Sequence, residues 1–266
     1  MQEISGQLTQ LRQTDSLSSG TSIFHRIHPL SKLAVTIVYI VCIVSFGKYD
    51  ISGLMPMILY PVLVFQMTGI PFSAFIRKMR YVLPLVCAIG LFNPLFDRAP
   101  LLRIAGFAVS GGTVSLITLV IKGILCLSAS FLLIATTSFD DICRALRIIH
   151  VPSLIVSLMM LTYRYIGVLA EEAAVMNDAY HLRAPGQKGI AFKAWGAFLG
   201  QLLLRSMDRA ERIYGGMQLR GFDGSFSFSG LRKACASDWL YAIILSAVFI
   251  LLLNFNLSVL IGGLFV

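Results

Sequence analysis

Two short segments of the sequence repeat one arrangement, a leucine followed at once by an arginine. They are residues 181–186, HLRAPG, and residues 218–223, QLRGFD. In each segment the arginine, Arg183 or Arg220, ends a helical pattern and is followed by glycine or proline within two residues. A single arginine there is typical of a helix C-terminus, where it stabilises by roughly 0.3–1 kcal/mol and glycine supplies the cap. The repetition favours a second interpretation, in which both arginines bind a partner.

Two long helices must position these arginines. The pattern predicts one helix from about residue 153 to Arg183, a turn at 185–189, and a second helix from about residue 190 to Arg220. A helix of roughly 30 residues is about 45 Å long, and a short turn makes neighbouring helices antiparallel or crossed. The two arginines therefore form separate contact points, which suits a partner with two similar halves.

The second helix has one apolar face. Residues spaced alternately by four and three share a face, and here they are Leu199, Leu203, Ser206, Ala210, Ile213, Met217 and Arg220. The opposite side carries Arg205, Asp208, Arg209, Glu211 and Arg212. Three partners are open for the apolar face: the neighbouring helix, the bilayer or a docked protein. We assign a helix-packing role to Leu199, Leu203, Ala210, Ile213 and Met217.

The composition is typical of an integral membrane protein. Of 266 residues, 57% are hydrophobic and only 13% are charged, and the mean hydropathy is +0.80. Soluble domains are nearer a quarter charged. The net charge of +9 fits cytoplasmic loops better than nucleic-acid binding. The sequence predicts an all-α membrane protein with about five transmembrane helices and two long cytoplasmic helices.

Apolar runs define the expected spans. They cover residues 33–46, 51–70, 81–96, 113–136 and 238–266. The first is shorter than a bilayer requires, but Leu30 and the stem of Lys32 can extend it. Between them we expect an interfacial helix at 71–80, where phenylalanines and basic residues take opposite faces. A small hairpin is expected at 101–109, with Gly111 and Gly112 as its turn.

Three regions follow from this order. We expect residues 1–136 to form an N-terminal lead and four spans, 137–237 a cytoplasmic region with the two long helices, and 238–266 a C-terminal transmembrane helix. Basic residues gather in the N-terminal lead, after the second span and in the 137–237 region. The positive-inside rule therefore predicts a cytoplasmic N-terminus.

Few other side chains in the sequence are candidates for catalysis or for binding a metal ion or ATP. No cysteine lies in a C-x-x-C pair and no P-loop is present, so this chain does not bind ATP by that motif. The four histidines are scattered and predict no metal site: His25, His28, His150 and His181. Lys122 lies inside a span, where a charge is often functional but can also snorkel. Both interpretations of Lys122 are open, and no catalytic residue is predicted.

The repeated segments resemble the transmembrane T component of energy-coupling factor (ECF) transporters, the CbiQ/EcfT family, with its paired Ala-Arg-Gly-type motifs. Residues 28–33, HPLSKL, are similar to that family's Asp-Pro-Arg-x-Lys-Leu segment. Residues 137–152 resemble the segment leading into the family's coupling helices. Further similarities lie at Asp141, Ala145-Leu146-Arg147, Tyr163-Arg164 and Glu171-Glu172. The resemblance covers most of the chain.

The resemblance implies a membrane scaffold that is not an enzyme and binds no cofactor. In the family, two ATP-binding-cassette ATPases hold the ATP, and a small membrane S component selects a substrate, a vitamin or a transition-metal ion. A location in the prokaryotic inner membrane follows. ATPase coupling is implied at a first tip, Leu182, Arg183 and Ala184, and at a second tip, Leu219, Arg220 and Gly221.

The sequence departs from the family pattern at two places. Leucine replaces the small residue before each arginine, and His28 and Leu30 stand where the family has aspartate and arginine. Two other functions are open. A stand-alone secondary transporter requires ionisable residues clustered in the spans, and a membrane enzyme requires a cluster such as Asp140 and Asp141 with His150.

Overall fold

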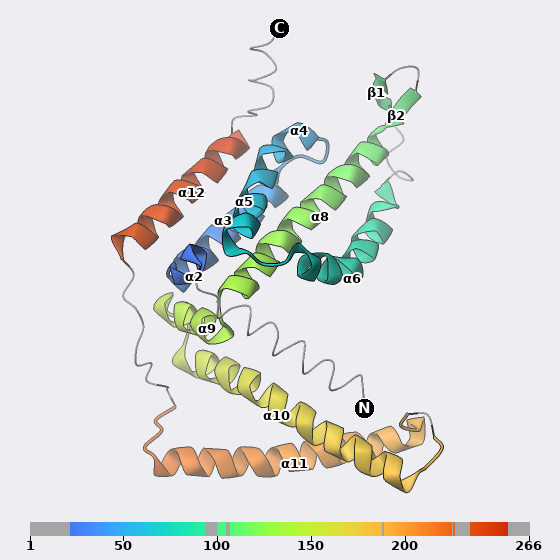
Figure 1. Ribbon diagram of the computed structural model, residues 1–266, viewed down its shortest axis with the longest axis vertical. Coiled ribbons are helices and arrows are strands. Elements are labelled where there is room, and N and C mark those ends of the chain that lie inside the picture. The colour runs from blue at the N-terminus through green and yellow to red at the C-terminus, as the bar shows by residue number, and fades with distance from the viewer. Residues whose placement is uncertain are drawn as a thin grey trace. The chain divides into compact units, whose positions relative to one another are not determined.

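The computed structural model describes residues 22–93, 100–104, 107–187, 189–224, 226 and 235–254 (Figure 1). These residues divide into two compact units. One unit, the bundle, holds the described residues from 22 to 138 and from 235 onward. The other, the arm, holds those from 139 to 226.

Helices make up most of both units. The arm consists of α9 (Phe139–Ile148), α10 (Ser153–Arg183) and α11 (Phe192–Leu219). The bundle consists of α2 (Ile23–Arg26), α3 (Pro29–Ser45), α4 (Ile51–Leu54), η1 (Pro56–Ile58), α5 (Leu59–Thr68), α6 (Phe72–Gly90), β1 (Pro100–Ile104), β2 (Phe107–Ser110), α8 (Gly111–Thr136) and α12 (Ala236–Asn254).

The helical content and apolar lengths confirm the predicted all-α membrane class. Among the described residues, four helical stretches are long and apolar enough to cross a membrane: Ile51–Thr68, Gly111–Thr136, Ser153–Arg183 and Ala236–Asn254. Pro29–Ser45 is apolar but shorter. Of the expected last span, residues 255–266 lie outside the described residues.

Two local expectations were wrong. The interfacial helix at 71–80 and the span after it are one helix, α6, with Pro84 inside. Figure 1 shows α6 bending along its length, as a proline allows because it removes one backbone hydrogen bond. The expected hairpin exists, but Ile104 pairs with Phe107 across a two-residue connection. Gly111 and Gly112 begin α8 instead of forming the turn.

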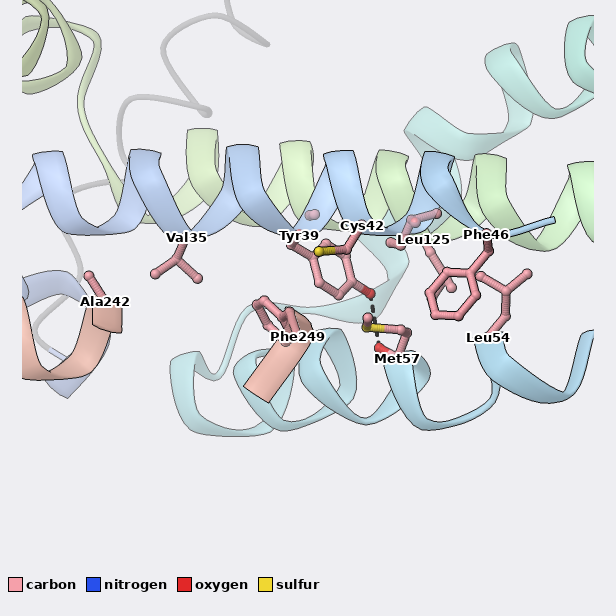
Figure 2. Close-up of a cluster of buried hydrophobic side chains, with 11 residues drawn as sticks. Val35, Tyr39, Cys42, Phe46, Leu54, Met57, Leu125, Ala242 and Phe249 are labelled. Atoms are coloured by element: carbon pink, nitrogen blue, oxygen red, sulfur yellow. Dashed lines mark hydrogen bonds between the residues drawn. The ribbon is translucent and has the colours of Figure 1, made fainter. Parts of the chain in front are cut away.

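The main core of the bundle surrounds Tyr39 of α3. Tyr39 is fully buried, and its hydroxyl donates to the Met57 carbonyl at 2.9 Å. Its ring lies 5.0 Å from that of Phe249 in α12. Figure 2 shows Tyr39, Met57 and Phe249 converging beside Leu125 of α8. The buried hydroxyl finds an acceptor, as burial of a polar group requires.

The N-termini of α3 and α12 meet at a buried carboxylate. Asp238, 5% exposed, accepts hydrogen bonds from the backbone amides of His28 at 3.3 Å and Cys235 at 3.0 Å. Nδ1 of His28 accepts from the Leu30 amide at 3.2 Å. His28 thus caps α3 with its imidazole, where the resembling family has an aspartate. The first span accordingly begins at Pro29, four residues before the expected start.

Candidate docking site on the arm

The first tip closes α10 without a left-handed residue at Ala184. Arg183 is the last residue of α10, and the Ala184 amide donates to the Tyr180 carbonyl at 3.0 Å. Ala184 has φ −125°, which any residue adopts, and the left-handed conformation falls on Gly186 at φ +94°. Alanine is therefore compatible with the position after Arg183.

Tyr180 braces this first turn. Its hydroxyl donates to the Gln187 side-chain oxygen at 2.8 Å and accepts from the Ala191 amide at 3.2 Å. One phenol thereby joins both sides of the connection between α10 and α11. Sequence reasoning missed Tyr180, since only the fold brings residues 187 and 191 back to it.

The second tip closes α11 with a Schellman motif. The Phe222 amide donates to the Met217 carbonyl and the Gly221 amide to the Gln218 carbonyl, both at 3.0 Å. Gly221 has φ +78°, the left-handed conformation that this motif places after the cap. Glycine is required here for its backbone, so the Ala/Gly difference between the two tips has a conformational cause.

Each tip exposes a leucine side chain next to an arginine. Leu182 is 84% exposed and Leu219 is 91% exposed, and Arg183 and Arg220 are exposed as well. In the part of the chain that the structure describes, neither guanidinium makes a hydrogen bond or an ion pair. Neither leucine contributes to the packing of the arm. The arrangement offers apolar surface and a free bidentate donor at two places.

The two tips lie at opposite ends of α11. Figure 1 shows α10 and α11 crossing, with their connection at one end of α11 and its C-terminus at the other. Because α11 has 28 residues, the tips are separated by about 40 Å along its axis. The separation expected from helix length is present.

An ion-pair clasp joins α10 to α11 at the crossing. Glu172 accepts from Arg209 at 3.0 Å through one carboxylate oxygen and from Arg205 through the other. Arg205 and Arg209 are one turn apart on α11, so a single carboxylate reaches both. The spacing of Arg205 and Arg209 predicts that they lie opposite the apolar face of α11, but it does not identify Glu172 as their partner.

An apolar groove of about 480 Å³ opens between the two helices. Of the residues predicted to pack, Ala210, Ile213 and Met217 line it. Leu199 and Leu203, 54% and 61% exposed, lie nearer the start of α11 and outside the groove. No residue of α11 is buried. The arm thus leaves a long apolar face open to a partner.

Arg147 connects α9 to the segment after the second tip. Its guanidinium donates to the Phe226 carbonyl, and the rings of Phe222 and Phe226 lie 5.1 Å apart. At the other end of α9, Phe139 stacks on Tyr163 of α10 at 4.2 Å. The short helix is therefore tied both to α10 and to the chain leaving α11.

The remaining candidates have structural positions. His150, at φ +68°, follows the end of α9. The His150 amide donates to the Arg147 carbonyl, and the Val151 amide donates to the Leu146 carbonyl. His25 Nδ1 lies 2.6 Å from the Ser22 hydroxyl. Among the described residues, no group of three His, Cys, Asp or Glu side chains could hold a metal ion.

Comparison with known proteins agrees with this architecture. The CbiQ family model, described as "Cobalt transport protein", matches residues 20–229, which include both tips. The chain is 26% identical to the "Energy-coupling factor transporter transmembrane protein EcfT" of Bacillus subtilis strain 168 over 257 residues, 90% of this chain and 95% of the relative.

Two further relatives match over shorter stretches. The cobalt transport protein CbiQ of Rhodobacter capsulatus is 32% identical over 115 residues, 43% of this chain and 47% of the relative. The nickel permease LarQ of Lactiplantibacillus plantarum is 29% identical over 105 residues, 40% of this chain and 38% of the relative. The chain thus spans less than half the length of these two relatives. Since the family model covers well over half of this chain, the protein, a multi-pass membrane protein, belongs to the CbiQ family.

Proposed function

We propose that this chain is the transmembrane scaffold, or T component, of an ECF-type importer. In this role it couples ATP hydrolysis by two partner ATP-binding-cassette ATPases to movement of a substrate-binding S component. The chain itself performs no catalysis and holds no ATP. The observation that carries the proposal is the pair of Leu-Arg tips at opposite ends of α11, which are exposed and have no ion-pair partner among the described residues.

Each tip suits a groove on a protein partner. A leucine exposed by more than four fifths gains from burial by about 1.5–3 kcal/mol, and a guanidinium binds carboxylates or carbonyls with fixed geometry. Two tips about 40 Å apart along one helix reach two subunits at once. Arg183 would dock on one ATPase and Arg220 on the other.

The crossed helices provide a mechanical connection between the tips. The Glu172 clasp fixes α10 and α11 near the middle of both helices. Movement of one ATPase against the other would therefore turn the helices about this crossing. The groove lined by Ala210, Ile213 and Met217 changes shape with that turn, and we propose that the S component contacts this apolar surface.

We place α10 at the cytoplasmic membrane surface, although its length and hydropathy also fit a membrane span. The apolar residues of its first half line the groove with α11. Its second half carries Glu171, Glu172, Asp178 and Arg183, which are costly inside a bilayer. A cytoplasmic arm in turn requires the cytoplasmic N-terminus predicted from the charges, in the inner membrane of a prokaryotic cell.

The substrate class we propose is a vitamin or a transition-metal ion. Relatives carry names that refer to cobalt and nickel, while the EcfT relative is named for energy coupling alone. In this arrangement the S component would select the substrate.

The test replaces both tip arginines. R183E/R220E should abolish uptake by the reconstituted transporter and reduce recovery of the ATPases in a pull-down, while the chain still inserts. R212E is the matched control, because Arg212 is exposed on α11 away from both tips. Normal uptake and ATPase recovery in the double variant would refute the proposal. Uptake by the purified chain alone would instead identify a secondary transporter.

A further inference from the structure

The first half of α6 carries a basic surface that the proposed function does not use. Arg77 and Arg80, about one turn apart, are exposed. Among the described residues, neither guanidinium has a hydrogen-bond or ion-pair partner. The neighbouring Lys78 lies over the Phe131 ring, 5.1 Å from its centroid. Two of the three cations therefore have no counter-charge among the described residues.

A cluster of phenylalanines fixes the direction of this surface. Phe75 is 3% exposed, and its ring centre lies 5.4 Å from that of Phe65 in α5 and 5.8 Å from that of Phe131 in α8. With 3.6 residues per turn, anchoring Phe75 on α5 and α8 directs Arg77 and Arg80 away from the bundle. The cations are thus held outward by packing.

The outward surface of α6 becomes apolar directly after Arg80. Tyr81 is 80% exposed, Leu85 64% and Ile89 58%. In a membrane protein, such side chains face lipid, and tyrosine is enriched at the level of the headgroups. Leu85 lies about 12 Å further along the helix than Arg77, at 1.5 Å per residue. The arginines therefore stand at the boundary between polar and apolar surroundings.

The described residues of the bundle offer no free anion for these arginines. Its described residues include two carboxylates, Asp50 and Asp238. Asp238 is occupied by the amides of His28 and Cys235, and Asp50 precedes α4. Within the described bundle, neutralisation of Arg77 and Arg80 thus requires an external anion.

We infer that Arg77 and Arg80 bind the phosphate of anionic phospholipid headgroups. Guanidinium groups bind phosphate in bidentate fashion. Tyr81 and Leu85, 80% and 64% exposed, follow directly after Arg80 and would contact the upper acyl chains. The site takes phosphatidylglycerol or a chemically similar lipid, and it is independent of the proposed transport function.

The inference is tested on the purified full chain in detergent by native mass spectrometry, with phosphatidylglycerol and phosphatidylcholine titrated separately. R77Q/R80Q should weaken phosphatidylglycerol binding by roughly tenfold or more and leave phosphatidylcholine binding unchanged. R77K/R80K, which keeps the charge, should retain most of the affinity. Raising the ionic strength should weaken binding to the original chain.

The matched control is K48Q/R103Q, which removes the same net charge from the α3–α4 connection and β1. It should leave phosphatidylglycerol binding unchanged. Equal affinity in R77Q/R80Q, or an equal loss in the control, would overturn the inference. Displacement of the lipid by millimolar inorganic phosphate would also overturn it, since the site would then serve a free ion.

Discussion

Lys32 and Lys122 cap each other's helices at opposite ends of one antiparallel pair. Nζ of Lys32, in the first turn of α3, donates at 2.8 Å to the carbonyl of Thr136, the last residue of α8. Nζ of Lys122, within α8, donates at 2.5 Å to the carbonyl of Phe46, which follows α3. Final helix carbonyls lack intrahelical partners and carry the negative end of the dipole. Each lysine therefore stabilises the helix opposite its own.

We predict that K122M lowers the free energy of unfolding of the purified chain by about 2 kcal/mol, because it removes a charged donor from the end of α3. Thermal unfolding in detergent measures the effect. K122R should retain most of the stability. K48M is the matched control, since Lys48 is exposed and contacts the Tyr49 ring. An unchanged melting temperature in K122M would contradict a capping role.

G221A should disturb the second tip alone. Gly221 has φ +78°, which costs a residue with a side chain roughly 1–2 kcal/mol. We expect faster hydrogen exchange of the Gly221 and Phe222 amides and weaker ATPase capture. A184G is the matched control at the first tip, where φ is −125°. Equal effects of the two substitutions would show that backbone conformation is not the reason for glycine.

The prediction for His150 distinguishes a role of its backbone conformation from a role of its imidazole side chain. His150 occupies the left-handed position that ends α9 at φ +68°, which asparagine tolerates and a β-branched residue does not. H150N should therefore preserve stability and uptake, while H150V should lower the free energy of unfolding by about 1–2 kcal/mol. Loss of uptake in a stable H150N variant would restore a chemical role for this histidine.

The sequence predicted most helices because long apolar runs have few alternatives in a membrane protein. It failed at α6, where Arg77 to Arg80 suggested a separate surface helix. Charge pattern shows which face is polar, but it does not show whether the backbone continues past Arg80. The backbone does continue, and Pro84 lies inside α6.

The tips were recognised because both Leu-Arg pairs end a helical pattern, which is local information. The residues that position the tips do so through contacts with residues far away in the sequence. Periodicity placed Arg205 and Arg209 on one face, but it does not specify that Glu172 meets them. The hydrogen-bond partners of Tyr180 and Arg147 were not predicted for the same reason, since they come from other segments.

Cys235 should be alkylated at a lower pH than an ordinary cysteine. It is exposed just before α12. Hydrogen bonds from the Ser237 backbone and hydroxyl and from the Ala236 backbone hold the pKa of its thiol below the usual value. A lowered pKa increases the thiolate fraction at neutral pH, and the thiolate is the nucleophile.

The measurement is the rate of iodoacetamide modification of the Cys235 peptide as a function of pH. S237A should move the midpoint upward, because the hydroxyl donor is lost while the backbone donors remain. Free cysteine under the same conditions is the reference. A midpoint at or above that of free cysteine would refute the assignment.

E172Q should loosen the crossing of α10 and α11. The Glu172 carboxylate forms ion pairs with both Arg205 and Arg209, whereas the neutral amide of glutamine cannot neutralise two cations. We expect a lower melting temperature of the purified chain. In the assembled transporter, we expect more ATP hydrolysed per substrate imported, since tip movement would be transmitted less completely. ATPase recovery should stay normal, because both tips are intact.

A double-mutant cycle isolates this ion pair from other effects of the substitution. R209Q should lower the melting temperature in the original chain and have a smaller effect in the E172Q background. D178N is the control on α10, because Asp178 has no hydrogen-bond or ion-pair partner among the described residues. Additive effects of E172Q and R209Q would mean that the clasp contributes no coupling. The crossing would then depend on apolar contacts alone. The Glu172 ion pairs would not be the point about which α10 and α11 are proposed to turn.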